Sequence, residues 1–177
     1  MNMADSAKGG ECGMSLLEVM IVVTILGLLC VILANSYQGW SEKYRVETAV
    51  KEMFADLMDA RGRAIQRSRA HFVTVTTSPA GYQMFEDTSP QPDGNGTLEA
   101  ADRAVRTAGV RYPITVIPAG TTQINFNRDG LVSMNSGSTG VIRLTSPVSA
   151  DYDCITLGPT RIKMGQFNAA TNACDER

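Results

Sequence analysis

The chain begins with a long apolar segment that has few polar interruptions. From residue 19 to residue 34 the sequence reads VMIVVTILGLLCVILA, which is sixteen residues without a charge. Counted from Met14, the segment has 21 residues, and Ser15 and Glu18 are among its few polar members. A helix of that length measures ~31 Å, which is about the thickness of one hydrocarbon core. The pattern therefore predicts a membrane-spanning helix over residues 14–36.

Residues 37–70 are predicted to continue the same helix with an amphipathic surface. The segment 40–69 contains no proline and a single glycine. Apolar residues recur at alternating spacings of four and three, which places them on one face of a helix. The stripe consists of Val46, Val50, Met53, Leu57, Ala60 and Ala64. We expect this stripe to cover a sheet.

From residue 71 onward the hydrophobic period changes from that of a helix to that of a strand. Alternating segments bounded by turn residues predict strands at 72–77, 82–85, 105–110, 114–117, 123–127, 131–134, 140–145, 154–157 and 161–164. Many short strands with close turns are typical of an antiparallel sheet, here in two packed layers. The expected fold class is α+β, with a long N-terminal helix packed on an antiparallel β domain over residues 71–177.

Composition narrows the classes of function. The chain has 177 residues and a formal net charge of −2, so it has no global basic field for wrapping nucleic acid. His71 is the one histidine, which excludes a multi-histidine metal site and argues against a histidine-dependent triad. We expect it to be a surface residue at the helix exit, or one whose ring nitrogens are satisfied by hydrogen bonds. No P-loop motif occurs. The protein is therefore expected not to be an enzyme.

A cleavable secretory signal is the alternative explanation of the apolar segment. Such a signal needs a small-x-small site after its apolar core, and residues 34–36 supply one. The leader of such a signal should be positive, whereas residues 1–13 contain two acids and one lysine. Glu18 bears on the same question, because a carboxylate at the centre of a bilayer costs roughly 2.5–3.5 kcal/mol. Glu18 is therefore either paired or solvated at the level of the headgroups.

The residues around the start of the apolar segment resemble a known signal. Gly13, followed by MSLLE and the long apolar run, resembles the class III signal of type IV pilins and type II secretion pseudopilins. The resemblance implies that a prepilin peptidase cuts after Gly13, removes residues 1–13 and N-methylates Met14. The first mature residue of the family is usually Phe. Many members also have a proline near Asn35, so the resemblance leaves open whether the helix melts there.

The spacing of Met14 and Glu18 suggests how the glutamate acts. After cleavage, the α-amino group of Met14 is a cation with a pKa of about 8. Glu18 follows one helical turn later, so the two charges can neutralise each other within one chain. The resemblance implies a second role, in which Glu18 pairs with Met14 of a neighbouring subunit during assembly.

The domain resembles one branch of the same superfamily. The segments INFNRDGLV, GVIRLTS and DCITLGPTRIKMG, in this order, resemble GspH/FimT-like minor pseudopilins. This implies a minor pilin or pseudopilin, a structural subunit of a type II secretion pseudopilus or a type IV pilus. Its partners would be other pilins or pseudopilins, the prepilin peptidase and the inner (cytoplasmic) membrane. It would cross this membrane once, with the β domain outside the cytoplasm, and would need no cofactor or small-molecule substrate.

Two of the four cysteines fall in the predicted β domain. Cys12 lies in the leader and Cys30 in the apolar segment, which leaves Cys154 and Cys174. If the N-terminus is anchored, the domain lies outside the cytoplasm, where an oxidising compartment favours a disulfide. The tail from residue 166 to residue 173 has weak predicted structure and would benefit from the bridge. The alternative is two free thiols.

The loop 91–102 is rich in oxygen atoms that could bind calcium. Five residues match positions 3, 5, 7, 9 and 12 of an EF-hand loop: Asp93, Asn95, Thr97, Glu99 and Asp102. Gln91 stands where the first acid is expected, and Asp102 is shorter than the usual glutamate. Calcium is therefore a candidate ligand, and the alternative is a polar excursion whose glycines only make turns.

Arg161 and Lys163 are the candidate nucleic-acid residues. The alternation of a strand places both cations on one face, where they could contact phosphates. In DNA-binding minor pilins a Gly-Arg-x-Arg motif stands at this place, whereas this chain has Thr160 and Lys163 instead of the glycine and the second arginine. A pilus-tip subunit that binds DNA for uptake is the alternative function. Solvated strand charges explain the same residues, and we expect no nucleic-acid partner.

Overall fold

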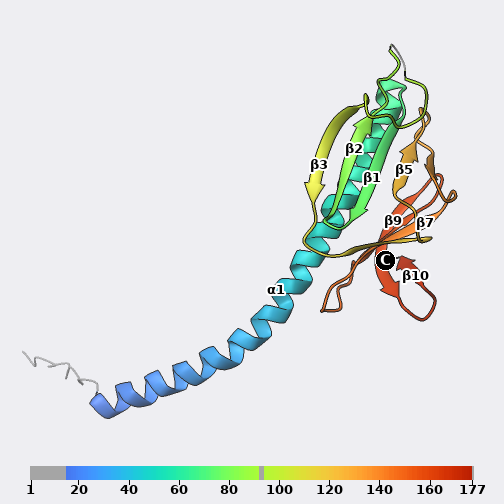
Figure 1. Ribbon diagram of the computed structural model, residues 1–177. Coiled ribbons are helices and arrows are strands. Elements are labelled where there is room, and N and C mark those ends of the chain that lie inside the picture. Colours follow the sequence, from blue (N-terminus) through green and yellow to red (C-terminus); the bar gives the residue numbers. More distant parts are fainter. Residues whose placement is uncertain (1–14, 92–93, 177) are drawn as a thin grey trace, which may run out of the picture. The chain divides into compact units, whose positions relative to one another are not determined.

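The computed structural model describes residues 15–91 and 94–176, without the side chains of residues 32–36. Within these residues the chain forms one long helix, α1 (Leu16–Arg67), and ten strands (Figure 1). The strands are β1 (His71–Thr77), β2 (Ala80–Glu86), β3 (Arg103–Gly109), β4 (Ile114–Ile117), β5 (Gln123–Phe126), β6 (Val132–Met134), β7 (Gly140–Leu144), β8 (Cys154–Leu157), β9 (Ile162–Asn168) and β10 (Ala173–Glu176). The chain divides into two compact units, Met1–Trp40 and Ser41–Arg177.

The backbone of α1 is one helix without a break, because no proline interrupts it. It continues through Asn35, the position at which the resemblance left local melting open. The helix ends in a turn with two backbone hydrogen bonds, from the amide of Ser68 to the carbonyl of Ile65 (3.4 Å) and from Arg69 to Ala64 (3.2 Å). This is the Schellman pattern, and Ser68 adopts the left-handed backbone that it requires, with φ of 52°. The turn leads directly into β1.

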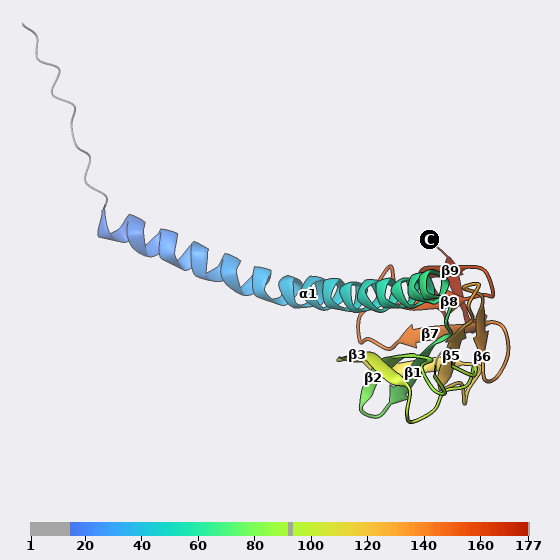
Figure 2. The same cartoon turned by 90° about the horizontal axis from the view of Figure 1, so that it is seen from above.

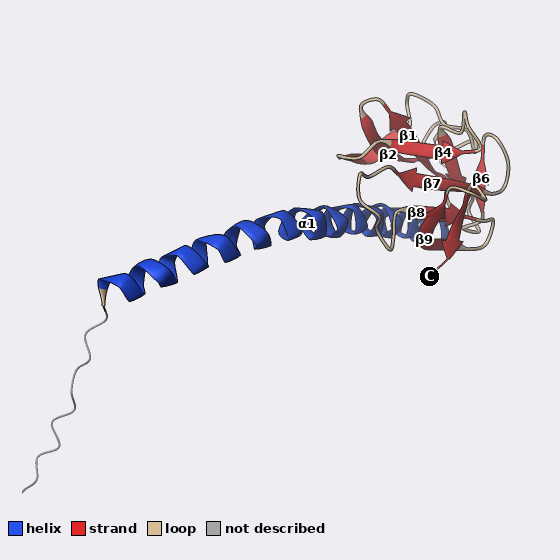
Figure 3. Ribbon diagram, turned by 90° about the horizontal axis from the view of Figure 1, so that it is seen from below, coloured by secondary structure: helices blue, strands red, loops and turns tan. Residues whose placement is uncertain are grey.

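The strands form two antiparallel sheets, as the sequence predicts. The first sheet has the order β3-β2-β1-β5-β6, and the second has the order β10-β9-β8-β7-β4. The chain leaves the first sheet after β3, returns to it at β5 and enters the second sheet again at β7. Figures 2 and 3 show strands of both sheets beside the C-terminal half of α1. Strands β4 and β8 have the predicted bounds, and β1 to β3 and β5 to β7 differ from the predicted bounds by at most about two residues.

The predicted stripe on α1 lies in the hydrophobic core. Each of its six residues is at most 1% exposed: Val46, Val50, Met53, Leu57, Ala60 and Ala64. The same core contains inward-facing residues of both sheets, such as Met84, Ile124 and Phe126 from the first sheet and Ile142, Leu144 and Ile155 from the second. Burying a large apolar side chain contributes about 1.5–3 kcal/mol, so this interface supplies a large part of the stability of the domain.

The C-terminal tail is more regular than the sequence predicts. The tail from residue 166 to residue 173 was predicted to have weak structure of its own, yet part of it lies in strands, because β9 extends to Asn168 and β10 pairs with it in antiparallel register. The segments GQFN and ACDE that form these strand ends have few β-branched residues. Their strand structure therefore depends on pairing and covalent linkage rather than on intrinsic propensity.

The covalent linkage is the predicted disulfide between Cys154 and Cys174, whose Cα atoms lie 6.0 Å apart. Cys154 is on β8 and Cys174 on β10, so the bridge crosses the intervening strand β9. Cys154 lies opposite Gly165 of β9. A Cβ atom at Gly165 would come within 3.1 Å of the Cys174 Sγ and 2.0 Å of the Asp175 carbonyl oxygen. Glycine therefore leaves the space that the bridge and β10 occupy.

Reduction of this disulfide should destabilise the domain. A bridge that closes a loop of about 20 residues contributes about 3 kcal/mol, so we expect a clear fall in the melting temperature of the fragment 41–177 when dithiothreitol is added. The measurement is thermal unfolding by circular dichroism, with titration of free thiols at each condition. An unchanged melting temperature in a sample that shows both thiols free would contradict this prediction.

Candidate assembly surface

The N-terminal half of α1 presents apolar side chains on all sides. Within residues 16–31 the exposed fractions of the large apolar side chains range from 45% at Val19 to 78% at Leu16. These residues are Leu16, Leu17, Val19, Met20, Ile21, Val22, Val23, Ile25, Leu26, Leu28, Leu29 and Val31. A helix that is apolar all round is stable only in an apolar environment, either in a lipid bilayer or among other helices. We call residues 16–31 the assembly surface.

Glu18 is the acidic residue within this surface. It lies in the first turn of α1, where its amide donates to the carbonyl of Ser15 at 3.0 Å and its side chain is exposed. The N-terminal end of a helix dipole stabilises a negative charge at this position. Gly13 and Met14, the predicted cleavage and methylation residues, lie outside the described residues. The pairing of Glu18 with the amino group of Met14 therefore stays a prediction.

Among the residues that the structure describes, no helix is both long enough and apolar enough to cross a membrane. The predicted membrane segment, residues 14–36, includes Met14 and the side chains of residues 32–36, which lie outside the description. Membrane insertion therefore stays a prediction from the sequence.

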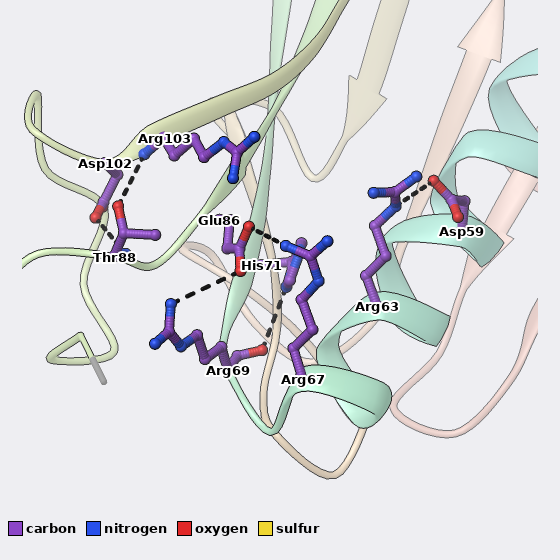
Figure 4. Close-up of polar contacts among 9 residues, drawn as sticks. All are labelled: Asp59, Arg63, Arg67, Arg69, His71, Glu86, Thr88, Asp102 and Arg103. Carbon is purple, nitrogen blue, oxygen red and sulfur yellow. Dashed lines mark hydrogen bonds and ion pairs between the residues drawn. The ribbon is translucent and has the colours of Figure 1, made fainter. Parts of the chain in front are cut away.

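A buried polar cluster joins the end of α1 to the first sheet (Figure 4). Glu86 of β2 is 3% exposed and accepts a hydrogen bond from Arg67 at 2.6 Å, while the guanidinium of Arg69 lies 3.9 Å away. His71 of β1 lies opposite Glu86 in the strand register. The Nδ1 of His71 is 3.3 Å from the carbonyl oxygen of Arg69, so we assign the ring hydrogen to Nδ1. Its Nε2 has no hydrogen-bond partner among the described residues.

Burial and charge set the protonation of this cluster. Burial lowers the pKa of His71, and the Arg69 carbonyl and the Glu86 charge oppose this effect only in part. Burial by itself would raise the pKa of Glu86, but the hydrogen bond and the charge of Arg67 outweigh it and lower that pKa. Near neutral pH the cluster is therefore a neutral imidazole beside a carboxylate held by two arginines. His71 differs from the expectation, because it is fully buried and one of its nitrogens is unsatisfied.

A second polar contact joins the middle of α1 to the first sheet. The hydroxyl of Tyr82 donates to the carboxylate of Asp56, and the Nε of Arg106 lies 2.9 Å from the same carboxylate. Asp56 is 6% exposed and Tyr82 is 4% exposed. Burial, followed by the hydrogen bond to Asp56, raises the pKa of Tyr82. This contact and the Arg67–Glu86 contact fix the helix on the sheet at two points along its length.

The arginines in the last turns of α1 are engaged within the domain. Arg61 donates to the carbonyl of Thr160 at 3.0 Å, and Arg63 donates to Asp59 at 2.7 Å. The next two arginines along the chain are those that pair with Glu86. These side chains therefore make intramolecular contacts.

Two buried carboxylates hold the loop that was predicted to bind calcium. Asp87 is 1% exposed and accepts hydrogen bonds from the amides of Asn95 (3.2 Å) and Gly96 (2.7 Å). Gly94 has φ of 75°, and a Cβ atom there would lie 2.0 Å from the carboxylate of Asp87. Asp102 accepts from three amides within 3.1 Å, those of Thr88, Ser89 and Glu99. The sequence pattern does not single out Asp87, because an acid that binds turn amides is expected about two residues before them, whereas Asp87 binds amides eight and nine residues farther along the chain.

Hydrogen bonds between residues of this loop hold its described part in place. The side chain of Asn95 accepts from the amide and hydroxyl of Thr97 and donates to Glu99. Within residues 15–91 and 94–176, no group of three or more His, Cys, Asp or Glu side chains is placed to hold a metal ion. Asp93 lies outside these ranges, so calcium binding stays a prediction.

Lys163 lies near the start of β9 on the second sheet, and Arg161 directly precedes this strand. Arg161 is exposed, and Lys163 forms an ion pair with Glu176 of β10. The pair neutralises one of the two cations that were candidates for phosphate contacts. The structure therefore places only Lys163 on a strand, whereas the sequence predicted that both residues lie on one, and the ion pair weakens the positive surface that the sequence suggests.

Comparison with known proteins identifies relatives of both parts of the chain. The family model of the Type II transport protein GspH matches residues 49–160, and that of the Prokaryotic N-terminal methylation motif matches residues 8–34. Two fimbrial proteins of Pseudomonas aeruginosa are 33% identical over 84 residues, which is 48% of this chain and 54% of theirs. The chain thus spans about half the length of the curated relatives that it matches.

A solved structure shares the fold. The type IV minor pilin FimU of Pseudomonas aeruginosa superposes with a TM-score of 0.51 at 14% identity, covering 77% of this chain and 98% of that chain. An N-terminal helix packed on a two-sheet antiparallel β domain is therefore the pilin fold, as the sequence predicted. With the GspH model matching more than half of its length, the chain belongs to the GspH family, as a GspH/FimT-like minor pilin.

Acidification should destabilise the β domain through His71 and Glu86. The folded state lowers the pKa of both groups, so it binds fewer protons than the unfolded state, and the stability that each contributes is lost as the pH falls. The ordinary pKa values are 6.5 for His71 and 4.5 for Glu86. We therefore expect the melting temperature of the fragment 41–177 to fall as the pH drops below 6.5, and to fall further below 4.5.

Variants assign this effect to the two groups. His71→Gln should flatten the first part of the pH profile, and Glu86→Gln should flatten the second part and lower stability at neutral pH by leaving Arg67 without its carboxylate. Asp59→Asn is the matched control, because Asp59 of α1 pairs with Arg63 in a more exposed position than Glu86 does with Arg67. A His71→Gln profile as steep as that of the wild type would show that another group titrates.

Proposed function

We propose that the protein is a non-catalytic minor subunit of a fibre that is assembled at the inner membrane, either a type II secretion pseudopilus or a type IV pilus. The match of residues 8–34 to the methylation motif, in a chain with a pilin fold, is the observation that carries this proposal. The N-terminal helix would hold the chain in the bilayer, with the β domain outside the cytoplasm. It would then pack among the helices of other pilins. The all-round apolar character of the assembly surface suits both environments.

Glu18 would set the axial position of the subunit during assembly. Cleavage after Gly13 by the prepilin peptidase would leave a cationic, methylated amino group on Met14. An unpaired charge among packed helices is costly because the local dielectric constant is low. A carboxylate from Glu18 of one subunit that meets the amino group of Met14 on its neighbour would remove both penalties, and would favour one register over others.

Both kinds of fibre stay within the proposal. The matching family model is named for type II transport, whereas the relatives are fimbrial proteins and a type IV minor pilin. DNA binding at a pilus tip is the alternative function. It has less support, because Lys163 is paired with Glu176 and the arginines of α1 are engaged within the domain. Secretion genes or pilus genes beside the gene for this chain would separate the two systems.

Processing by a prepilin peptidase tests the proposed function. In cells that contain the peptidase, the chain should lose residues 1–13 and acquire one methyl group on Met14, which mass spectrometry of the membrane fraction would detect. Gly13→Val should block the cut, because a β-branched side chain crowds the scissile bond. A mature N-terminus near Ser36 or Tyr37 would instead identify the apolar segment as an ordinary secretory signal.

Removal of the Glu18 carboxylate should separate membrane insertion from assembly. Glu18→Ala should leave insertion intact or improve it, since a carboxylate in an apolar segment is costly. Cleavage after Gly13 should persist, and co-purification with other pilins should fall, because Met14 of the neighbour loses its counter-charge. Glu18→Gln should behave nearly as Glu18→Ala does. Glu11→Ala is the control, because Glu11 lies in the part that is removed. Wild-type incorporation of the Ala variant would show that Glu18 is merely solvated.

A further inference from the structure

Two aromatic side chains lie next to each other on α1, directly after the apolar segment. Tyr37 is 64% exposed and Trp40 is 66% exposed. Their ring centroids are 6.3 Å apart and the planes are inclined by 45°. A separation of three residues places both on one face of the helix. Within the described part of the first unit, this aromatic pair marks the end of its apolar surface.

The composition of the chain on either side of this pair changes sharply. Residues 19–34 carry no charge, whereas residues 42–47 include Glu42, Lys43, Arg45 and Glu47. The aromatic pair therefore stands where an apolar helix becomes a charged one. Tyrosine and tryptophan combine an apolar ring with a polar hydrogen-bonding group, and for this reason they collect at the boundary between hydrocarbon and water.

The lengths agree with such a boundary. Residues 14–34 give ~31 Å of helix, which is about one hydrocarbon core. Tyr37 and Trp40 then follow at ~4.5 Å and ~9 Å farther along the helix axis. The headgroup layer occupies roughly the next 5–8 Å on each side of the core. With Met14 at one edge of the hydrocarbon, the two rings fall within or just beyond the headgroup layer at the other edge.

We propose that Tyr37 and Trp40 form an interfacial anchor that contacts the phospholipid headgroups on the side of the β domain. The anchor sets the depth of the helix in the bilayer before the subunit is assembled into a fibre. This inference rests on the proposed membrane insertion of residues 14–36. The headgroup layer suits both parts of these side chains, since acyl chains can cover the exposed rings while phosphate and carbonyl oxygens can accept hydrogen bonds from a tyrosine hydroxyl or an indole N–H.

The chain contains a single tryptophan, so Trp40 itself reports its surroundings. The full chain is reconstituted in vesicles of phosphatidylcholine and phosphatidylglycerol, and flotation first shows whether it binds. Trp40 emission is then recorded with lipids brominated either near the carbonyl or near the end of the acyl chain. We expect a blue shift relative to an indole in water, and stronger quenching by the bromine near the carbonyl.

Variants test whether the pair sets the depth. Tyr37→Ala should change the ratio of shallow to deep quenching of Trp40, because one of the two interfacial contacts is lost. Tyr37→Phe keeps the ring and should change the ratio less. Gln38→Ala is the matched control, since Gln38 is exposed on the same turn and lies outside the pair. An unchanged ratio in Tyr37→Ala would overturn the role of Tyr37.

The remaining outcomes separate this inference from the proposed function. If the chain does not float with the vesicles, membrane insertion fails, and the anchor fails with it. If the chain floats but Trp40 emits as in water and is not quenched by either lipid, insertion stands and the anchor is overturned. A blue shift that appears only after other pilins are added would also overturn it, because the rings would then contact neighbouring subunits rather than lipid.

Discussion

The fold of the β domain depends on the burial of the apolar stripe of α1 that runs from Val46 to Ala64. Both sheets turn their inward faces toward one core, and residues of the stripe such as Val50 and Leu57 are almost completely buried there. At the start of the same helix, apolar side chains lie on all of its faces. They are confined to one face only from about Val46, the first buried residue of the stripe. This change of pattern decides where the β domain begins, because only a one-sided stripe leaves the opposite face compatible with water.

An apolar stripe determines which face of a helix packs on a sheet. It specifies the position of the helix along its own axis only weakly. The polar contacts supply that information, since a buried carboxylate without its partner costs several kcal/mol. Asp56 with Tyr82 and Arg67 with Glu86 hold two points of α1 against the same strand, β2. The β domain is therefore fixed to the second half of the helix whose first half carries the assembly surface.

Local segments with weak propensity are held by longer-range contacts. The disulfide crosses β9 at Gly165 and holds β10, while Asp87 and Asp102 supply acceptors for the amides of the loop between β2 and β3. In both places a glycine or an acidic residue, which is unfavourable in a regular strand, allows a contact with a neighbouring segment of the chain. The domain can thus carry a polar loop and a polar tail without losing its core.

The amino-acid sequence was enough to predict the features that depend on neighbours along the chain. These are the apolar segment before residue 36, the stripe from Val46 to Ala64, most strands and the motif at Gly13 and Glu18. The folded structure was needed to identify β10, the burial of His71 beside Glu86 and the role of Asp87. Strand β10 depends on its pairing with β9 and on the disulfide, His71 depends on its pairing opposite Glu86, and Asp87 depends on hydrogen bonds to loop amides eight and nine residues away. Periodicity reports which face a residue occupies but not which residue it contacts.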